Sequence, residues 1–217
     1  MTLQLLDGDS APHVLAIGCH ADDIEIGCGG TLLTLLAQRD DVSVTWVVLA
    51  AAGERAGEAE ASARSFLAGA RESNVIVESF RDGFLPYLGP VVKESFERLK
   101  RDLEPDLILT HTESDRHQDH RLVAELTWNT FRRHLIFEYE IPKYDGDLVN
   151  PGVFVPLSEE TAQRKVALLR EHFVTQGEKH WFDEELFLGL LRLRGMQANE
   201  PTRYAEAFHC RKLTLGF

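Results

Sequence analysis

The chain has 217 residues, 44% of them hydrophobic, and its 23 basic and 35 acidic side chains give a net charge of −12. This length suits one domain spanning 1–217 with a sizeable core, and the negative charge argues against nucleic-acid binding because it repels a phosphate backbone. No run reaches the roughly 18 apolar residues of a membrane span, and the first residues lack a signal-peptide pattern. We therefore expect a cytoplasmic protein.

Strands and helices are expected to alternate along the chain, because continuous apolar runs alternate with helical apolar spacing. The first part predicts strand 13–19, helix 26–38, strand 42–50, helix 57–73, strand 74–80, helix 91–103, strand 105–111 and helix 120–134. The remainder predicts strand 135–142, a loop with a short extended piece at 149–160, helix 159–173 capped by Ser158, helix 184–194 and a strand within 203–213. This order favours an α/β fold with a mostly parallel sheet and helices on both faces.

The three cysteines, Cys19, Cys28 and Cys210, have no C-x-x-C spacing. An odd number without that spacing supports neither a disulfide framework nor a thiolate zinc site. We expect them to be buried thiols.

A first polar cluster, HADDIEIGCGG at residues 20–30, follows the first predicted strand. Ligands of parallel sheets bind at the carboxyl ends of strands, where His20, Asp22 and Asp23 fall. Capping of the following helix is the alternative role of the two aspartates. Their charge and the lack of a G-x-G-x-x-G pattern disfavour a dinucleotide site. The glycines allow a ligand or partner to approach the backbone closely.

A second polar cluster, HTESDRHQDHR, begins at the end of the fourth predicted strand. It contains three histidines and three acids, which are His111, His117, His120, Glu113, Asp115 and Asp119. If the first and fourth strands are neighbours, both clusters share one crevice. Imidazole and carboxylate ligands suit a divalent metal such as zinc, and two histidines with one carboxylate leave a position open for water. A solvated loop explains this cluster alone; the two clusters together favour a catalytic metal site.

These motifs resemble those of the PIG-L or LmbE-like de-N-acetylase family. HADDIEIGCGGTL is similar to its H-P-D-D motif and HQDH to its H-x-x-H motif, and the likeness runs over about 13–125. The resemblance implies a Rossmann-like fold and a zinc-dependent hydrolase, with another divalent transition metal as the alternative, that deacetylates an N-acetylated amino sugar or sugar conjugate. It implies that His20, Asp23 and His120 are the metal ligands and that Asp22 is the general base. It also implies that His117 stabilises the oxyanion or protonates the amine, and that Asp119 orients that histidine.

Three positions depart from the family pattern: Ala21 replaces a usual proline, Ile24 a common glutamate, and Asp115 a tyrosine found in some members. The tyrosine contribution to an oxyanion hole is therefore in doubt. The glutamate loss keeps open a non-catalytic module that retains the metal site. A metal-dependent phosphoesterase is a further alternative, because the same ligands serve it.

Substrate contacts are expected from arginines near the two motifs, since the guanidinium binds phosphate or carboxylate in a bidentate way. The candidates are Arg55, Arg64 and Arg116, with ordinary surface charge as the alternative for each, although Arg116 lies inside the second motif. The segment EYEIPKYDGDL adds Tyr139, Lys143 and Tyr144 as sugar contacts, although strand packing explains the tyrosines equally well. We expect a small-molecule partner and no nucleic acid or membrane span, and the apolar segment 181–195 leaves a homo-oligomer open.

Overall fold

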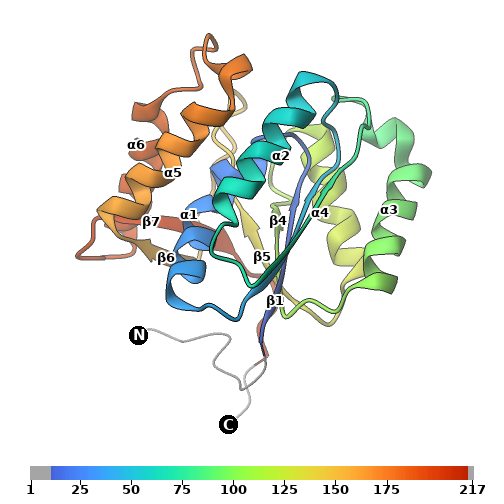
Figure 1. The fold of residues 1–217 in the computed structure, drawn as a ribbon, viewed down its shortest axis with the longest axis horizontal. Coiled ribbons are helices and arrows are strands. Elements are labelled where there is room, and N and C mark those ends of the chain that lie inside the picture. Colours follow the sequence, from blue (N-terminus) through green and yellow to red (C-terminus); the bar gives the residue numbers. More distant parts are fainter. Residues whose placement is uncertain (1–10, 215–217) are drawn as a thin grey trace.

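The computed structural model describes residues 11–214, in which seven strands form one sheet between helical layers (Figure 1). The strands are β1 His13–Gly18, β2 Ser43–Val48, β3 Glu72–Val77, β4 Leu107–His111, β5 Leu135–Tyr139, β6 Val153–Leu157 and β7 Tyr204–His209. The helices are α1 Asp23–Gln38, α2 Glu54–Phe66, α3 Gly89–Asp102, α4 Gln118–Thr130, α5 Glu159–His172 and α6 Glu184–Gln197, with short 3-10 turns η1 Leu85–Leu88 and η2 Val174–Gln176. The expected α/β class is confirmed.

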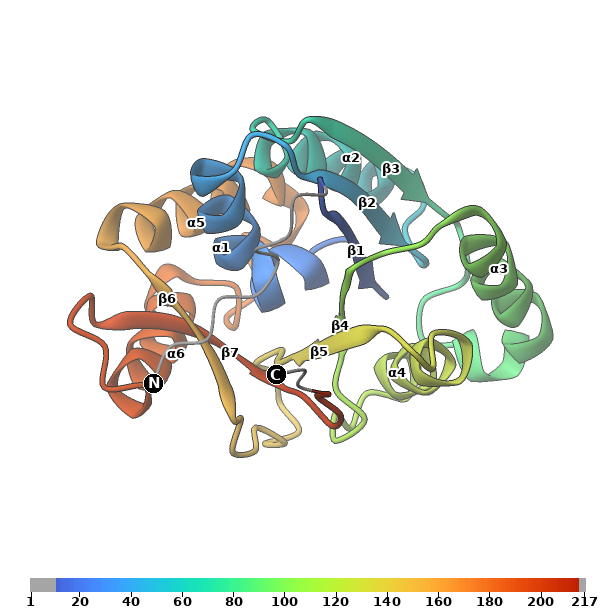
Figure 2. The same cartoon turned by 90° about the horizontal axis from the view of Figure 1, so that it is seen from below.

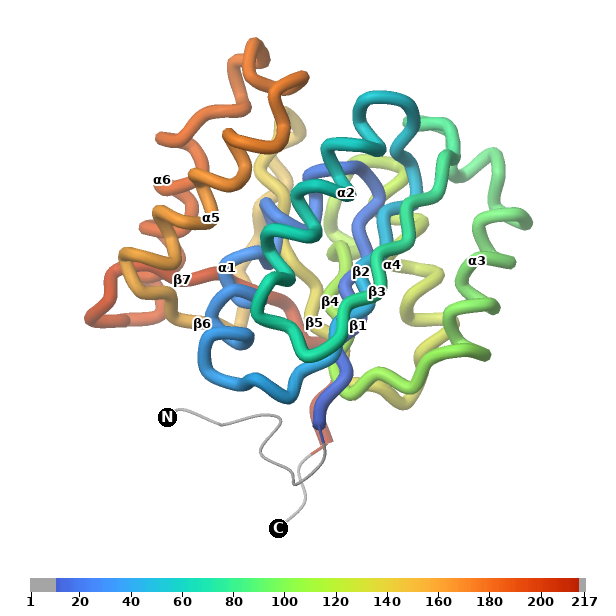
Figure 3. Tube along the Cα trace, viewed as in Figure 1, coloured from blue at the N-terminus to red at the C-terminus, as the bar shows by residue number. Residues whose placement is uncertain are grey.

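The strand order in the sheet is β3-β2-β1-β4-β5-β7-β6. The first five strands of the chain pair in parallel, whereas β7 runs antiparallel to both β5 and β6 at one side (Figure 2). β1 and β4 are direct neighbours, with Val14 opposite Leu107, although about ninety residues of chain separate them (Figure 3). The carboxyl ends of these two strands, and the polar clusters that follow them, therefore meet at one edge of the sheet.

Two apolar clusters fix the helical layers on opposite faces of the sheet. Side chains of α1, α2 and α5 pack with one set of strand residues, including Val14 and Trp46. Side chains of α3 and α4 pack with the alternate set, including Leu15 and Ile17. This alternation is the period-two pattern of a sheet buried on both faces. No helix within residues 11–214 is long and apolar enough to cross a membrane.

Several expected boundaries shift in the structure. Helix α1 begins at Asp23 instead of Ile26, and α2 begins at Glu54, before the Ala-rich stretch that predicted it. The loop at 149–160 contains β6, whose Pro156 is tolerated because β6 is an edge strand. The cysteines are free thiols; Cys19 and Cys28 are buried as expected, but Cys210 is only partly buried.

Glycines in α1 let neighbouring side chains approach the helix, although glycine lowers helix propensity. A Cβ at Gly27 would lie 2.2 Å from the ring of Tyr139, and one at Gly29 would lie 2.6 Å from Phe66. A Cβ at Gly30 would lie 2.5 Å from Leu157. The glycine-rich half of the first motif therefore packs α1 against β5, α2 and β6.

We predict that Gly27→Ala destabilises the protein by about 1–3 kcal/mol, the usual cost of overpacking a core. The Tyr139 ring is fully buried and its hydroxyl donates to the carbonyl of Ile17 at 2.7 Å, so it has no free direction in which to move. Urea denaturation measures the effect. The control is Gly189→Ala, since Gly189 lies within α6 with nothing near its Cβ position and should gain helix propensity. Equal stability changes in the two variants would contradict this packing role.

Candidate metal and catalytic site

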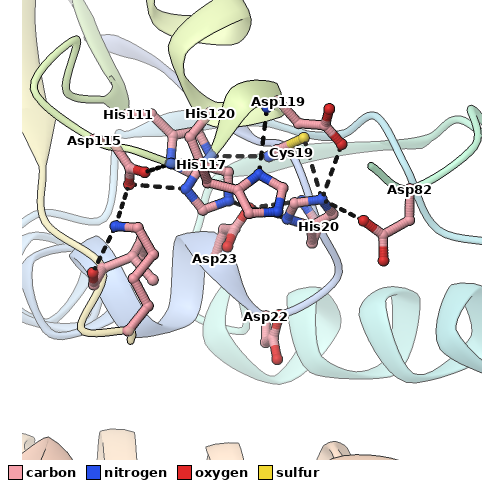
Figure 4. Close-up of polar contacts among 12 residues, drawn as sticks. Cys19, His20, Asp22, Asp23, Asp82, His111, Asp115, His117, Asp119 and His120 are labelled. Carbon is pink, nitrogen blue, oxygen red and sulfur yellow. Dashed lines mark hydrogen bonds and ion pairs between the residues drawn. The ribbon is translucent and has the colours of Figure 1, made fainter. Parts of the chain in front are cut away.

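The two polar clusters converge where β1 and β4 end. The chain turns after Gly18 and enters α1 at Asp23, which places His20 in the turn. After β4 a second turn leads into α4, with His117 as the N-cap and His120 in the first helical turn. Figure 4 shows these side chains directed toward one another.

Three potential ligand atoms form a compact triangle. The Nδ1 atom of His20 lies 3.0 Å from Nε2 of His120, and Oδ2 of Asp23 lies 3.4 Å from each of these nitrogens. A tetrahedral zinc ion about 2.1 Å from its ligands separates them by about 3.4 Å. The residues therefore fit a single divalent cation with a coordination position to spare.

The protonation pattern of this triangle suits a cation. Burial would lower the pKa of His20, but nearby Cys19, Asp23 and Asp119 raise it well above its usual value. Burial, together with His111, lowers the pKa of His120 to about 4. The 3.0 Å contact between the two rings therefore joins a histidine that favours its charged form to one that favours its neutral form.

The Asp23 carboxylate stays ionised at the centre of this arrangement. Burial favours its neutral form, but His120, His111 and His20 outweigh burial and hold its pKa well below the usual value. His111 is not free to act as a ligand through Nε2, because the Cys19 N–H donates to that nitrogen at 3.0 Å. The His111 ring stacks on the His120 ring, with centroids 3.9 Å apart, and so restricts the movement of the His120 ring.

Carboxylates contact the outer nitrogen of both triangle histidines. Asp115 Oδ2 lies 2.8 Å from Nδ1 of His120, while Asp82 Oδ1 and Asp119 Oδ2 lie 3.0 and 3.4 Å from Nε2 of His20 (Figure 4). Such outer partners fix the ring orientation and tautomer of a metal-binding histidine. Asp82, in the loop after β3, was not among the sequence candidates, since only sheet order brings that loop to the site.

Asp22 faces the cavity instead of capping α1. It occupies the N-cap position, but its side chain makes no capping hydrogen bond, and Oδ2 lies 3.1 Å from Nη2 of Arg55. Burial raises the pKa of Asp22, although the Arg55 cation opposes the increase. The capping alternative for Asp22 is therefore wrong.

The Asp119 carboxylate does not contact His117. It accepts from the main-chain N–H groups of Gly83 at 2.6 Å and Leu85 at 3.1 Å, which ties the loop after β3 to α4. The contact with His117 comes instead from the Asp119 main-chain N–H, which donates to Nδ1 at 3.3 Å. Asp119 thus contacts His117 through its backbone, whereas its carboxylate lies 3.4 Å from Nε2 of His20.

A cavity of about 730 Å³ opens beside the triangle. It is lined by both clusters and by loops following β2, β3, β5 and η2, including the residues His20, Asp22, Asp23, Arg55, Arg81, Asp82, His117, His120, Lys143, Tyr144, Lys179 and Trp181. Arg55 is thus the one predicted arginine that lines it. Arg64 is exposed on α2 beside Glu60, and Arg116 is exposed but does not line the cavity. Tyr139 is fully buried and does not line the cavity either.

Comparison with known proteins finds a matching family model and a relative among deacetylases. Residues 15–131 match the family model described as PIG-L: GlcNAc-PI de-N-acetylase. The uncharacterized deacetylase YaiS of Escherichia coli (strain K12) is 29% identical over 171 residues, which cover 73% of this chain and 89% of YaiS.

Solved structures share the fold at lower identity. N,N'-diacetylchitobiose deacetylase from Pyrococcus horikoshii superposes with a TM-score of 0.72 at 21% identity, covering 93% of this chain and 84% of that one. GalB, the 4-carboxy-2-hydroxymuconate hydratase from Pseudomonas putida KT2440, gives 0.76 at 17% identity, covering 95% and 98%. Since a hydratase and a deacetylase share this fold, the fold alone does not decide the reaction.

The sheet and its surrounding helices are those of an α/β protein with the LmbE-like deacetylase fold. Because the family model covers more than half of the chain, the protein belongs to the PIG-L family of de-N-acetylases. Membership supports an amide-hydrolysing deacetylase that acts on sugar conjugates.

Proposed function

We propose that the protein is a zinc-dependent de-N-acetylase that removes acetyl from an N-acetylated amino sugar or sugar conjugate. The observation that carries the proposal is the 3.0–3.4 Å triangle of His20, Asp23 and His120 beside Asp22, in a cavity large enough for a small molecule. Zinc is preferred because imidazole nitrogen with one carboxylate is a common zinc ligand set.

The three triangle residues would hold the metal and leave one face open to the cavity. When bound, zinc supplies Lewis acidity, which lowers the pKa of a bound water to about 7 and polarises the acyl carbonyl. An amide needs this help because its carbonyl is weakly electrophilic and its amine is a poor leaving group.

Asp22 is the proposed general base. Its carboxylate accepts a proton from the attacking water, whose oxygen forms a bond to the acyl carbon. When the carbon–nitrogen bond breaks, Asp22 returns that proton to the departing nitrogen, which yields the free amine and acetic acid, and the acid then ionises to acetate at neutral pH. A buried carboxyl with a raised pKa suits both steps, because a pKa closer to neutral pH lets the group both take up and release a proton.

His117 is the proposed donor to the oxyanion. Its Nδ1 accepts the Asp119 N–H, so the single proton of the neutral ring is on Nε2. Burial and the neighbouring His20 lower the pKa of His117, which favours this neutral form. A neutral Nε2–H donates a hydrogen bond to a developing oxyanion without giving up its proton. This assignment favours the first of the two roles that the family resemblance implies.

Two of the four cations that line the cavity are placed to bind an anionic substituent of the substrate, although four aspartates line it too. Arg55 is already paired with Asp22 and Glu58. Arg81 and Lys179 also line the cavity, and neither has a carboxylate partner within residues 11–214. Arginine recognises phosphate and carboxylate groups well, so these two cations, with Arg55, are the proposed subsite for such a group.

A panel of acceptors tests the proposed function. We expect zinc-loaded protein to release free amine and acetate from N-acetylglucosamine conjugates, with carboxylated or phosphorylated conjugates preferred over neutral ones. A generic phosphate monoester and an unsaturated carboxylic acid test phosphoesterase and hydratase activity. Amine release from no conjugate, together with turnover of either other substrate, would refute the proposal. Zinc binding without any turnover would instead support the non-catalytic module.

The pH profile gives a further prediction for Arg55. Its cation lowers the pKa of Asp22, so Arg55→Gln should raise that pKa. Since the base works when deprotonated, the acid limb of kcat/KM should move to higher pH. The control is Arg64→Gln on the same helix, because Arg64 is exposed and pairs with Glu60 instead of Asp22. An acid limb that moves equally in both variants, or in neither, would rule out this coupling.

A further inference from the structure

Asp115 is a buried carboxylate that holds both histidines of the second motif. Its Oδ2 lies 2.8 Å from Nδ1 of His120, and its Oδ1 accepts the main-chain N–H of His117 at 2.8 Å. Its side chain is only 1% exposed. The position of this carboxylate therefore sets the direction in which the His120 ring faces.

Lys143 in turn holds Asp115. Its Nζ lies 2.8 Å from Asp115 Oδ2, 2.7 Å from Asp147 Oδ2 and 3.2 Å from the carbonyl oxygen of Ile141. An ammonium group has three protons, so these three acceptors use all of them. Although Lys143 lines the cavity, it has no proton free for a sugar, which argues against the substrate contact expected from the sequence.

Asp147 closes the network on the other side. Its Oδ2 accepts from Lys143 and also, at 2.6 Å, from the main-chain N–H of Arg116. Arg116 directly follows Asp115 in the chain. The loop after β5 is thereby fastened to the turn that precedes α4. Asp115 and Asp147 are both nearly buried, and a single cation lies between them.

We propose that Lys143 is a positioning residue for metal binding, which acts on His120 through Asp115. This inference rests on the proposed metal site. Without the ammonium, the two carboxylates would repel each other in a poorly solvated place, and Asp115 would lose the position that orients the ring. Because Asp115 Oδ2 accepts from Lys143 and from His120, the His120 proton is on Nδ1. The lone pair on Nε2 then faces His20 and Asp23.

The affinity of the metal-free protein for Zn²⁺, measured by competition with a chromogenic chelator, tests this role without substrate. We expect Lys143→Met to bind zinc more weakly, by up to the roughly 10- to 100-fold that loss of the outer partner Asp115 itself would cause. Lys143→Arg, which keeps a cation, should restore part of the affinity. The matched control is Lys179→Met, since Lys179 lines the same cavity but bonds to Gln176 instead of Asp115.

The outcomes separate this inference from the proposed function. If the wild-type protein binds no zinc, the proposed metal site fails. If the wild type and Lys143→Met bind zinc equally, the proposed metal site stands and the positioning role is overturned. A higher KM with unchanged zinc affinity would likewise overturn it, because that result marks a substrate contact.

The tautomer of His120 tests the same proposal in the unmodified chain, so it does not depend on how well Lys143→Met folds. In a long-range ¹H–¹⁵N spectrum of the metal-free wild type, we expect His120 as the Nδ1–H tautomer, with its signals identified by their loss in His120→Gln. An Nε2–H tautomer would overturn the proposal, since the lone pair would then face Asp115 instead of the metal.

Discussion

Zinc should leave the protein when His120 is replaced by alanine, and deacetylation should stop with it. The variant removes one of the three converging atoms proposed to hold the metal and leaves those of Asp23 and His20. We expect a loss of zinc affinity larger than the roughly 10- to 100-fold that an outer partner contributes. Zinc content after dialysis, measured by plasma emission spectroscopy, checks the result, and removal of zinc from the wild type with a chelator should abolish activity in the same way.

The control for this experiment is His134→Ala. His134 follows α4 and packs its ring against Phe131, away from the triangle, so its loss should leave zinc content and activity unchanged. A full equivalent of zinc in His120→Ala would remove His120 from the ligand set. A loss of zinc in both variants would point to adsorption on surface histidines.

The location of the site could be predicted from the sequence because it depends on strand ends. His20 follows β1 and His111 ends β4, and parallel strands that are neighbours place their carboxyl ends together. The beginning of α1 was harder to predict. Asp23 is the first helical residue because its main-chain N–H bonds to the carbonyl of His20 and its carboxylate accepts the His20 N–H, a turn that apolar periodicity does not indicate.

The outer residues of the site could not be predicted from motifs. Asp82 follows β3 and Lys143 follows β5, so each reaches the site only through sheet order and loop course. The burial of Tyr139 confirms the strand-packing alternative. Its close contact with Gly27 across the α1–β5 contact could not be predicted, because it depends on the missing glycine side chain. For Arg64 the alternative of ordinary surface charge is correct, because its side chain is exposed on α2 beside Glu60.

The environment of Asp22 makes its replacement informative. Its side chain does not cap α1, so changing it should cost the helix little. It does not contact the triangle through any hydrogen bond or ion pair recorded within residues 11–214; its partner there is Arg55 at 3.1 Å. Metal binding and proton transfer are therefore expected to be separable at this position.

Asp22→Asn should keep one equivalent of zinc and lower kcat by about 10²- to 10⁴-fold, the usual contribution of a positioned acid or base. The amide has the size of the carboxylate and still accepts from Arg55, but it cannot take a proton from water. Steady-state deacetylation and zinc content are measured together. Glu58→Gln is the control, because Glu58 also pairs with Arg55 but does not line the cavity. Wild-type activity in Asp22→Asn would exclude Asp22 as the base, and loss of zinc would make it a ligand.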